Sequence, residues 1–286
     1  MLKRHALVRS LSILLVIFIV SFAVPVEAKG VWGQLTSYWQ TSTTEPTDPT
    51  NQTDPPPFDG VGLAPEAIAR GDQMLLESAR FFEDRDAFDE AFDYFKQVVL
   101  EAEYLGSGIS RFKRWNQPMK LFMMGEYDAT DKAVVEQVFR WLSQIEGMPP
   151  LNFVESQAEA NYTYLFYPLE ELETKFDHYP PDNWGIASIW WDGNGHMTEG
   201  KGGISTDKPD REGRNHLIQE ELIQSFGLLN DSYDYPDSIF QQQWTLVQHP
   251  TDIDFALLKM LYSPALTMDM DVDQAYQALI EYYGLD

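Results

Sequence analysis

The chain contains no cysteine and only five histidines among its 286 residues. Without cysteine it forms no disulfide, no thiolate nucleophile, no iron–sulfur cluster and no Cys-based zinc site. The shortage of histidine leaves few imidazole groups to ligate a metal ion or to transfer protons. The absence of cysteine therefore excludes cysteine-based chemistry, and the five histidines limit the choice of ligands in any metal site.

Positive charge is also scarce. Lys and Arg number 20 against 45 Asp and Glu, which gives a net charge of −25. A field of that sign repels phosphate backbones and anionic lipid surfaces, so we expect no nucleic-acid partner and no membrane partner beyond a leader segment. The composition is 44% hydrophobic and 14% aromatic, which is enough to build a packed core despite the acidity.

Residues 1–28 have the three parts of a secretory signal peptide. Basic residues open the chain, an uncharged apolar stretch follows at 11–24, and Val26 and Ala28 place small residues at −3 and −1 of a cut after Ala28. The apolar stretch is shorter than the roughly 20 residues of a membrane-spanning helix. An uncleaved anchor is the alternative. We expect a secreted or periplasmic protein.

Two further regions precede the main domain. Residues 29–60 are rich in Thr, Pro and Asp and have no apolar period, which predicts a disordered linker. Residues 61–110 carry two apolar stripes at helical spacing, which predicts a helical hairpin packed against the rest of the chain. We expect residues 111–286 to form the main domain.

The main domain shows one order of strand and helix patterns. We predict strands at 120–124, 151–154, 162–167, 185–191 and ending near 205, and helices at 130–147, 169–175, 213–226, 252–262 and 271–283. One strand–helix–strand unit gives way to consecutive strands, which favours a mixed sheet over a doubly wound one. The sequence therefore predicts an α+β fold with a mixed sheet, one long helix after the last strand and a C-terminal helical part.

The long helix at 213–226 has two different faces. Its large apolar residues share one arc, which we expect to face the core: Ile218, Leu222, Ile223 and Phe226. Glu220, Glu221 and Gln224 cluster in the opposite arc, and His216 lies one turn before Glu220. This arrangement predicts a polar face that looks into a cleft.

The chain after this helix is expected to return to the same face. Gly227 is typical of a helix end, and a turn there brings Asn230 and Asp231 back toward the helix. Together with His216, Glu220 and Gln224, these residues are the predicted lining of the cleft.

The motif on this helix resembles a known zinc signature. Glu220-Glu221-x-x-Gln224-x-x-Gly227-x-x-Asn230 has the spacing of H-E-x-x-H-x-x-G-x-x-H in the metzincin zinc peptidases. The preceding order of strands and helices is similar to that fold, segment 236–240 stands where those enzymes carry a methionine turn, and 252–262 is similar to their closing helix. Over about 118–266 the pattern resembles most closely an uncharacterised family of secreted bacterial zincin-like proteins.

This resemblance implies a zincin-like fold with altered chemistry. Glu220, Gln224 and Asn230 occupy the places of the three ligand histidines, and Glu221 occupies that of the general base. Zinc needs nitrogen or anionic oxygen donors at roughly 2.0–2.2 Å, so one carboxylate and two neutral amides should hold it poorly. Without the metal, the pKa of a water stays near 15.7 instead of falling to about 7. We therefore expect no metal and no cofactor, and a non-catalytic relative that binds a protein, peptide or glycan in its cleft.

Two alternatives stay open. His216 with Glu220, Glu221 and Asp231 could form an oxygen-rich site for a divalent cation, with His216 and Glu220 as the metal candidates of a metal-dependent hydrolase or peptidase. A metal-free pair of catalytic acids is disfavoured because adjacent glutamates do not face each other. Alternatively, the polar residues bond backbone groups and have a purely structural role.

Two glycine- or acid-rich patterns are interpreted as structural. Segment 200–203 lacks the G-K-[ST] ending of a phosphate loop, so we predict a bulge or strand twist there. Asp269-x-Asp271-x-Asp273 lacks the Gly and Glu of a calcium loop, so we predict an ordinary helix cap.

Overall fold

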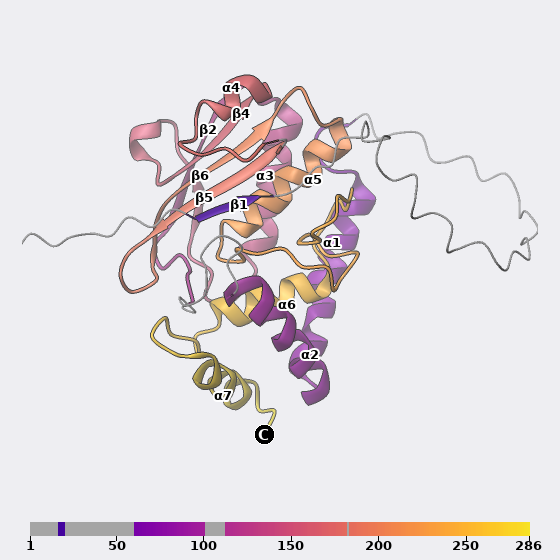
Figure 1. The fold of residues 1–286 in the computed structure, drawn as a ribbon. Coiled ribbons are helices and arrows are strands. Elements are labelled where there is room, and N and C mark those ends of the chain that lie inside the picture. Colours follow the sequence, from indigo (N-terminus) through magenta and orange to yellow (C-terminus); the bar gives the residue numbers. More distant parts are fainter. Residues whose placement is uncertain (1–16, 21–59, 101–111, 182) are drawn as a thin grey trace, which may run out of the picture.

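A computed structural model shows an α+β architecture (Figure 1). It describes residues 17–20, 60–100, 112–181 and 183–286. Most of the expected signal peptide and linker therefore lies outside the described residues, as does the end of the expected hairpin region at 101–110.

The centre of the fold is a mixed six-stranded sheet. Its strands are β1 (Ile17–Val20), β2 (Met119–Gly125), β3 (Leu151–Phe153), β4 (Tyr162–Tyr167), β5 (Gly185–Trp191) and β6 (Met197–Ser205). They lie in the order β1-β5-β6-β4-β2-β3, with β1 at one edge. Because β1 lies within the expected signal peptide, a cut after Ala28 would leave a sheet of the other five strands. Strands β3, β2, β4 and β6 are parallel, whereas β5 is antiparallel to both β6 and β1. The sheet therefore contains both parallel and antiparallel pairs, and the predicted mixed sheet is confirmed. The antiparallel strands β5 and β6 are joined by a tight turn, whereas the parallel pairs need longer connections.

Helices cover both faces of the sheet unequally. α3 (Ala129–Leu142) and α5 (Arg211–Gln224) lie on one face, and the short α4 (Leu169–Glu173) lies on the other (Figure 1). The face under α4 has a small core of its own, formed by Leu165, Leu172, Phe176 and Ile186. The face under α5 belongs to the main hydrophobic cluster, so α5 lies in the interior of the molecule.

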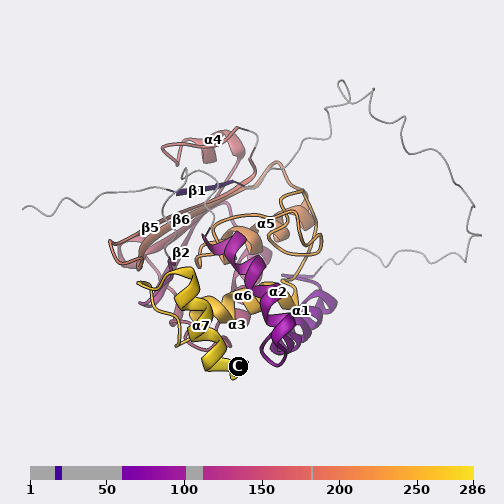
Figure 2. The same ribbon diagram turned by 60° about the horizontal axis from the view of Figure 1, so that its bottom comes forward.

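The remaining helices gather at the end of the molecule away from the sheet (Figure 2). They are α1 (Pro65–Glu77), α2 (Arg85–Phe95), α6 (Asp252–Tyr262) and α7 (Val272–Tyr283). Short irregular helical turns occur at Ser78–Phe82, Lys96–Leu100 and Gln157–Glu159. Side chains of α1 and α2 share the main hydrophobic cluster with the rest of the chain: α1 contacts α3 and α6, and α2 contacts α6.

The predicted order of elements is confirmed from β2 to α7, with most ends within two residues of the prediction. The largest difference is the end of α3, which stops at Leu142 rather than at Gly147. Residues 143–146 form tight turns instead of a further helical turn. Gly147, with φ +80°, follows these turns. Asp271 caps α7, as predicted from the acidic pattern, by accepting a hydrogen bond from the backbone N–H of Gln274 at 2.8 Å.

The prediction of a bulge at 200–203, the first of the two alternatives, is wrong. These residues pair regularly with both β4 and β5, and the irregular register lies at Trp190/Trp191 on β5. Glycine is needed because aromatic rings lie on the strand: a Cβ at Gly200 would be 2.4 Å from Cδ2 of Tyr162. The glycines therefore make room for packing rather than for a change of direction.

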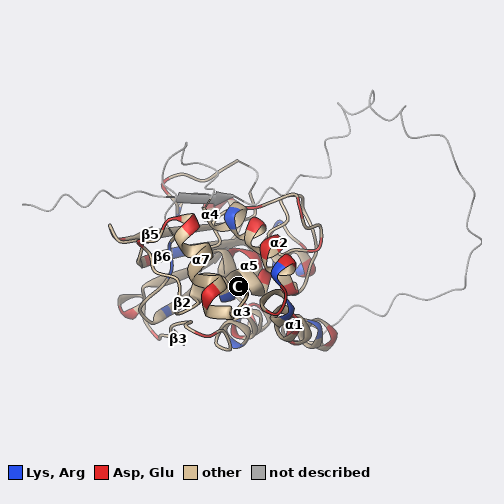
Figure 3. Ribbon diagram, turned by 90° about the horizontal axis from the view of Figure 1, so that it is seen from below, with Lys and Arg blue, Asp and Glu red and all other residues tan. Residues whose placement is uncertain are grey.

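Several helices carry acidic residues (Figure 3), and many of these residues are exposed. On α2, for example, Asp86, Glu90 and Asp93 are exposed while Phe88 and Phe92 are buried. Within the ranges that the structure describes, no helix has the length and apolar character needed to cross a membrane.

Candidate functional site

Helix α5 carries the motif residues, and its ends are set by local signals. Asp210 caps the start by accepting a hydrogen bond from the backbone N–H of Gly213 at 2.8 Å. Gly227, with φ +109°, turns the chain after the end, and a Cβ there would be 2.2 Å from the carbonyl oxygen of Lys113. Only glycine fits this conformation and this close approach.

The apolar face of α5 lies in the core, as predicted. Its four residues are fully buried: Ile218, Leu222, Ile223 and Phe226. The buried stretch continues around the helix, since every residue from Gly213 to Gln224 is buried. α5 is therefore an interior helix rather than a surface helix with one wet face.

The predicted open cleft is replaced by a sealed polar cluster. His216 is 3% exposed, Glu220 is 2% exposed and Glu221 is fully buried. The space beside them is a cavity of about 10 Å³, lined by His216, Glu220, Asp231 and residues 241–244. The chain after α5 folds back over the polar face, a long-range contact that no local pattern on α5 indicates.

His216 is held as a neutral imidazole. Its Nδ1 lies 2.8 Å from the carbonyl oxygen of Val247, so Nδ1 carries the hydrogen and Nε2 has the lone pair. Burial lowers the pKa of His216 to about 4. Nε2 faces Oε2 of Glu220 at 3.4 Å. The lone pair of Nε2 therefore faces the carboxyl group of Glu220.

Gln224 and Asp231 meet as the sequence predicts. Nε2 of Gln224 donates to Oδ1 of Asp231 at 2.6 Å, so the turn at Gly227 does bring Asp231 back to the helix. Asn230 points elsewhere. Its Nδ2 donates to the carbonyl oxygen of Gln97 at 3.1 Å, and its backbone N–H donates to the carbonyl oxygen of Val98. The structure thus removes Asn230 from the predicted cluster, because it ties the chain to the segment that follows α2.

The side chain of Glu221 projects from α5 toward the start of β5. A Cβ at Gly185 would be 2.7 Å from its Oε1, so the backbone of β5 lies directly against the carboxyl group. Tyr162 and Tyr164 are buried nearby; desolvation raises the pKa of both phenols, and the charge of Glu221 raises it further. Their hydroxyls bond Ser225 Oγ at 2.7 Å and the carbonyl oxygen of Ile218 at 2.9 Å. The carboxyl group at the position of the general base is enclosed by protein.

Segment 236–240, for which the resemblance implies the place of a methionine turn, is held by the buried carboxyl group of Asp254. Asp254, at the start of α6, accepts hydrogen bonds from Ser238 Oγ at 2.6 Å and from the backbone N–H of Ile239 at 3.0 Å. Ile239 and Phe240 are fully buried. This network fixes the chain just before it crosses α5.

Sequence reasoning missed the residues that close the site. Trp244 packs edge-on against His216 and against Trp184, with ring centroids 5.7 Å apart in each pair. Val247 supplies the acceptor for His216. The available signal was a lone tryptophan after a run of glutamines at 241–243, in a segment without helix or strand periodicity.

The residues present fit a catalytic zinc poorly. In the described part of the chain, no group of three or more His, Asp or Glu side chains is arranged to hold a metal ion. Of the motif positions, Gln224 uses its amide N–H on Asp231, and Asn230 is directed to Gln97. His216 and Glu220 are the pair best placed to contribute ligands to a cation.

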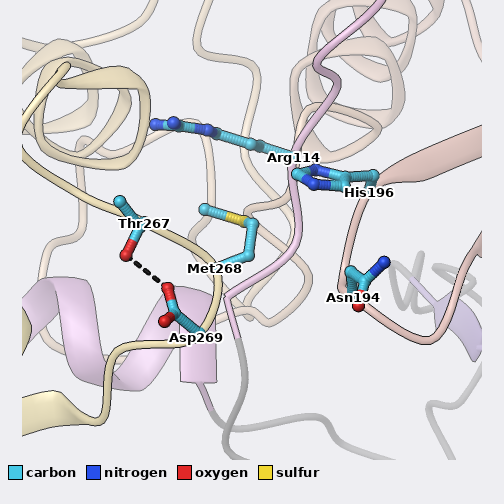
Figure 4. A pocket seen from close by; sticks show the side chains of 6 residues that line it. All are labelled: Arg114, Asn194, His196, Thr267, Met268 and Asp269. Atoms are coloured by element: carbon cyan, nitrogen blue, oxygen red, sulfur yellow. Dashed lines mark hydrogen bonds between the residues drawn. The ribbon is translucent and has the colours of Figure 1, made fainter.

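A larger cavity of about 300 Å³ lies away from this cluster (Figure 4). Arg114, Asn194, His196, Thr267, Met268 and Asp269 line it. Nη1 of Arg114 donates to the carbonyl oxygens of Leu261 and Ser263, and Thr267 Oγ1 donates to Asp269 Oδ1. These polar groups bond the protein rather than converge on a common point, so we assign no site there.

The mixed sheet and the buried polar helix define an α+β protein in which the motif helix is part of the core. The chain belongs to the family described as "Protein of unknown function (DUF2927)", which matches residues 89–281. The match runs from α2 to α7 and includes every residue of the polar cluster. No curated protein matches the chain.

Proposed function

We propose that this protein is a secreted, zincin-like binding or scaffolding protein without peptidase chemistry. This proposal is supported by the order β2-α3-β3-β4-α4-β5-β6-α5, in which the motif helix follows directly after the last strand, as the resemblance to zincins implies. Its partner is a protein, a peptide or a glycan encountered outside the cytoplasm, since a leader-like segment opens the chain.

The observation that carries this proposal is the burial of Glu221. A general base must reach the water or substrate from which it takes a proton. Glu221 is fully buried, and the backbone of β5 at Gly185 lies against its carboxyl group. In addition, the three ligand positions offer one carboxylate and two neutral amides, which polarise a water far less than imidazole-bound zinc does.

A hydrolysis assay tests the proposal. The purified protein is incubated with a quenched fluorescent peptide library and with casein, beside Glu221→Gln and the surface control Glu136→Gln. We expect all three proteins to release no more fluorescence than buffer alone. Hydrolysis by the wild type and the control that is lost in Glu221→Gln would overturn the proposal.

A metal-dependent hydrolase is the second candidate. It is favoured by the lone pair on Nε2 of His216, which faces Glu220 at 3.4 Å beside the cavity of about 10 Å³. That volume is about the space one water occupies. Here His216 would donate nitrogen and Glu220 would donate oxygen to a bound cation, and the cation would lower the pKa of a water.

Calorimetric titration with Mn²⁺, Zn²⁺ and Ca²⁺ separates the two candidates. The second candidate requires one saturable site that is lost in His216→Gln and in Glu220→Gln but is kept in Glu136→Gln. If none of the three ions gives saturable heat with the wild type, the second candidate fails and the binding protein stands.

A further inference from the structure

The segment that seals the polar cluster is a short irregular crossing. Residues 243–249, which we call the strap, run across α5 without a helix or strand of their own. Both flanks are firmly placed, because Phe240 is fully buried before the strap and Pro250 is buried after it. The strap therefore spans two fixed points.

Few contacts attach the strap to the rest of the chain. Across the described ranges, no backbone–backbone hydrogen bond joins residues 243–249 to another segment. Two bonds that involve side chains do: Nε2 of Gln248 donates to the carbonyl oxygen of Glu212 at 3.0 Å, and His216 Nδ1 donates to that of Val247. Segments with few hydrogen bonds and little buried apolar surface open with a lower free energy than the whole molecule.

Trp244 is the strap residue whose side chain covers the polar cluster. Its ring stands edge-on to His216 and Trp184, and a Cβ at Gly213 would be 3.0 Å from it. It lines the cavity together with Glu220 and Asp231. The closed strap thus keeps two carboxyl groups and an imidazole out of water. Opening would return them to solvent.

We propose that the strap is a gate that opens while the rest of the fold stays intact and so admits solutes to His216, Glu220 and Asp231. The hinge points are residues 241–242, next to the buried Phe240, and Pro250. The proposal deepens the proposed function, since it assumes that the polar face of α5 is the binding site. It also explains how a site with a cavity of only about 10 Å³ is reached.

The absence of cysteine makes a direct test available. A single thiol is introduced beneath the strap as Glu220→Cys, and another in the core as Val138→Cys, where the native side chain is fully buried. Each variant is labelled with an aromatic disulfide reagent over a range of urea concentrations below the unfolding transition. We expect Glu220→Cys to react at least tenfold faster than Val138→Cys, at a rate that changes little with urea.

Two strap variants add the control. Trp244→Ala is introduced into both the Glu220→Cys and the Val138→Cys variants. It is expected to raise the ratio of the labelling rate at position 220 to the labelling rate at position 138 about tenfold. Leu246→Ala, which shortens an exposed strap residue, is expected to leave that ratio unchanged. Equal labelling rates with the same urea dependence at both thiols would mean that the site opens only on global unfolding, and the gate would be refuted.

Proteolysis of the unmodified protein covers the case in which Glu220→Cys does not fold. Chymotrypsin cleaves after aromatic and large apolar residues, so an opening strap is cut at Trp244 or Leu246 before the core is. Protection of the strap equal to that of α5 would contradict the gate. Neither measurement depends on ligand binding. The proposed gate can therefore be refuted while the proposed function stands, and the proposed function can be refuted while the gate stands.

Discussion

His216 links the stability of the fold to pH. Its pKa falls from 6.5 in the unfolded chain to about 4 in the folded protein, because burial penalises the imidazolium ion. Between these pH values the unfolded chain binds more protons, so stability rises with pH across that window and is lost on acidification. Protonation of this buried imidazole therefore destabilises the fold in acid.

We predict that His216 alone removes about 3 kcal/mol from the free energy of unfolding between pH 7 and pH 4. Urea unfolding of the wild type and of His216→Gln at both pH values measures this contribution as a difference. The variant should lose about that much less stability on acidification. An identical loss in both proteins would show that His216 titrates normally.

Gly185 is a second residue with a specific consequence. A Cβ at this position would be 2.7 Å from Oε1 of Glu221, whereas a Cβ at Gly193 would meet nothing within 4 Å. We predict that Gly185→Ala lowers the free energy of unfolding by about 1–3 kcal/mol, as overpacking does. Thermal or urea unfolding checks this, with Gly193→Ala as the matched control.

The double variant Gly185→Ala/Glu221→Ala tests the cause. If the clash with the carboxyl group is responsible, the penalty of the alanine at 185 shrinks when Glu221 is already shortened. A penalty that is unchanged in the double variant would place the strain elsewhere.

At the scale of elements, α3 and α5 are joined by a buried ion-pair network. Asp131, fully buried in the first turn of α3, is bonded by Arg211 and Arg214 from the first turn of α5. The same carboxyl group completes a capping box with Asp128. One side chain therefore fixes the start of α3 against the start of the motif helix.

Removal of this charge should cost far more than removal of a surface charge. We predict that Asp131→Asn lowers the free energy of unfolding by about 3–5 kcal/mol, because a buried arginine loses its partner. Glu136→Gln breaks only the exposed 3.7 Å pair with Lys132 and should cost less than about 1 kcal/mol. Comparable losses in the two variants, measured by urea unfolding, would contradict this account.

The sequence predicts elements better than it predicts their surroundings. Strands β4 and β5 and helix α6 have the predicted bounds, because alternation, helical period and capping residues are local signals. The burial of the polar face of α5 is not local. It depends on Trp244 and Val247, more than 20 residues further along the chain, and no period on α5 indicates them.

The site could be predicted in part for the same reason. His216, Glu220 and Gln224 lie together because they share a helix face, and the glycine turn brings back Asp231. The prediction that Asn230 lies in the cluster is wrong, because Asn230 bonds Gln97, which follows α2 and is 133 residues away in sequence. The spacing of a motif thus places residues on one helix but does not determine what they contact.

At the scale of the whole molecule, the net charge of −25 sets the long-range electrostatics. Repulsion among the many carboxylates destabilises the compact state at low ionic strength, and salt screens it. The exposed acids on α2 illustrate where this repulsion acts.

We therefore predict that the melting temperature rises between 10 mM and 500 mM NaCl. Differential scanning fluorimetry measures this rise, and KCl at equal ionic strength should give the same result because screening depends on ionic strength. A melting temperature that falls with added salt would mean that attractive ion pairs outweigh the overall repulsion.

We propose that α5 belongs to the polar interior and holds no catalytic metal. Elemental analysis of the protein, purified without chelators and compared with His216→Ala and Glu220→Ala, tests this most directly. The account predicts no stoichiometric transition metal in any of the three proteins. One equivalent of zinc in the wild type that is lost in both variants would contradict it.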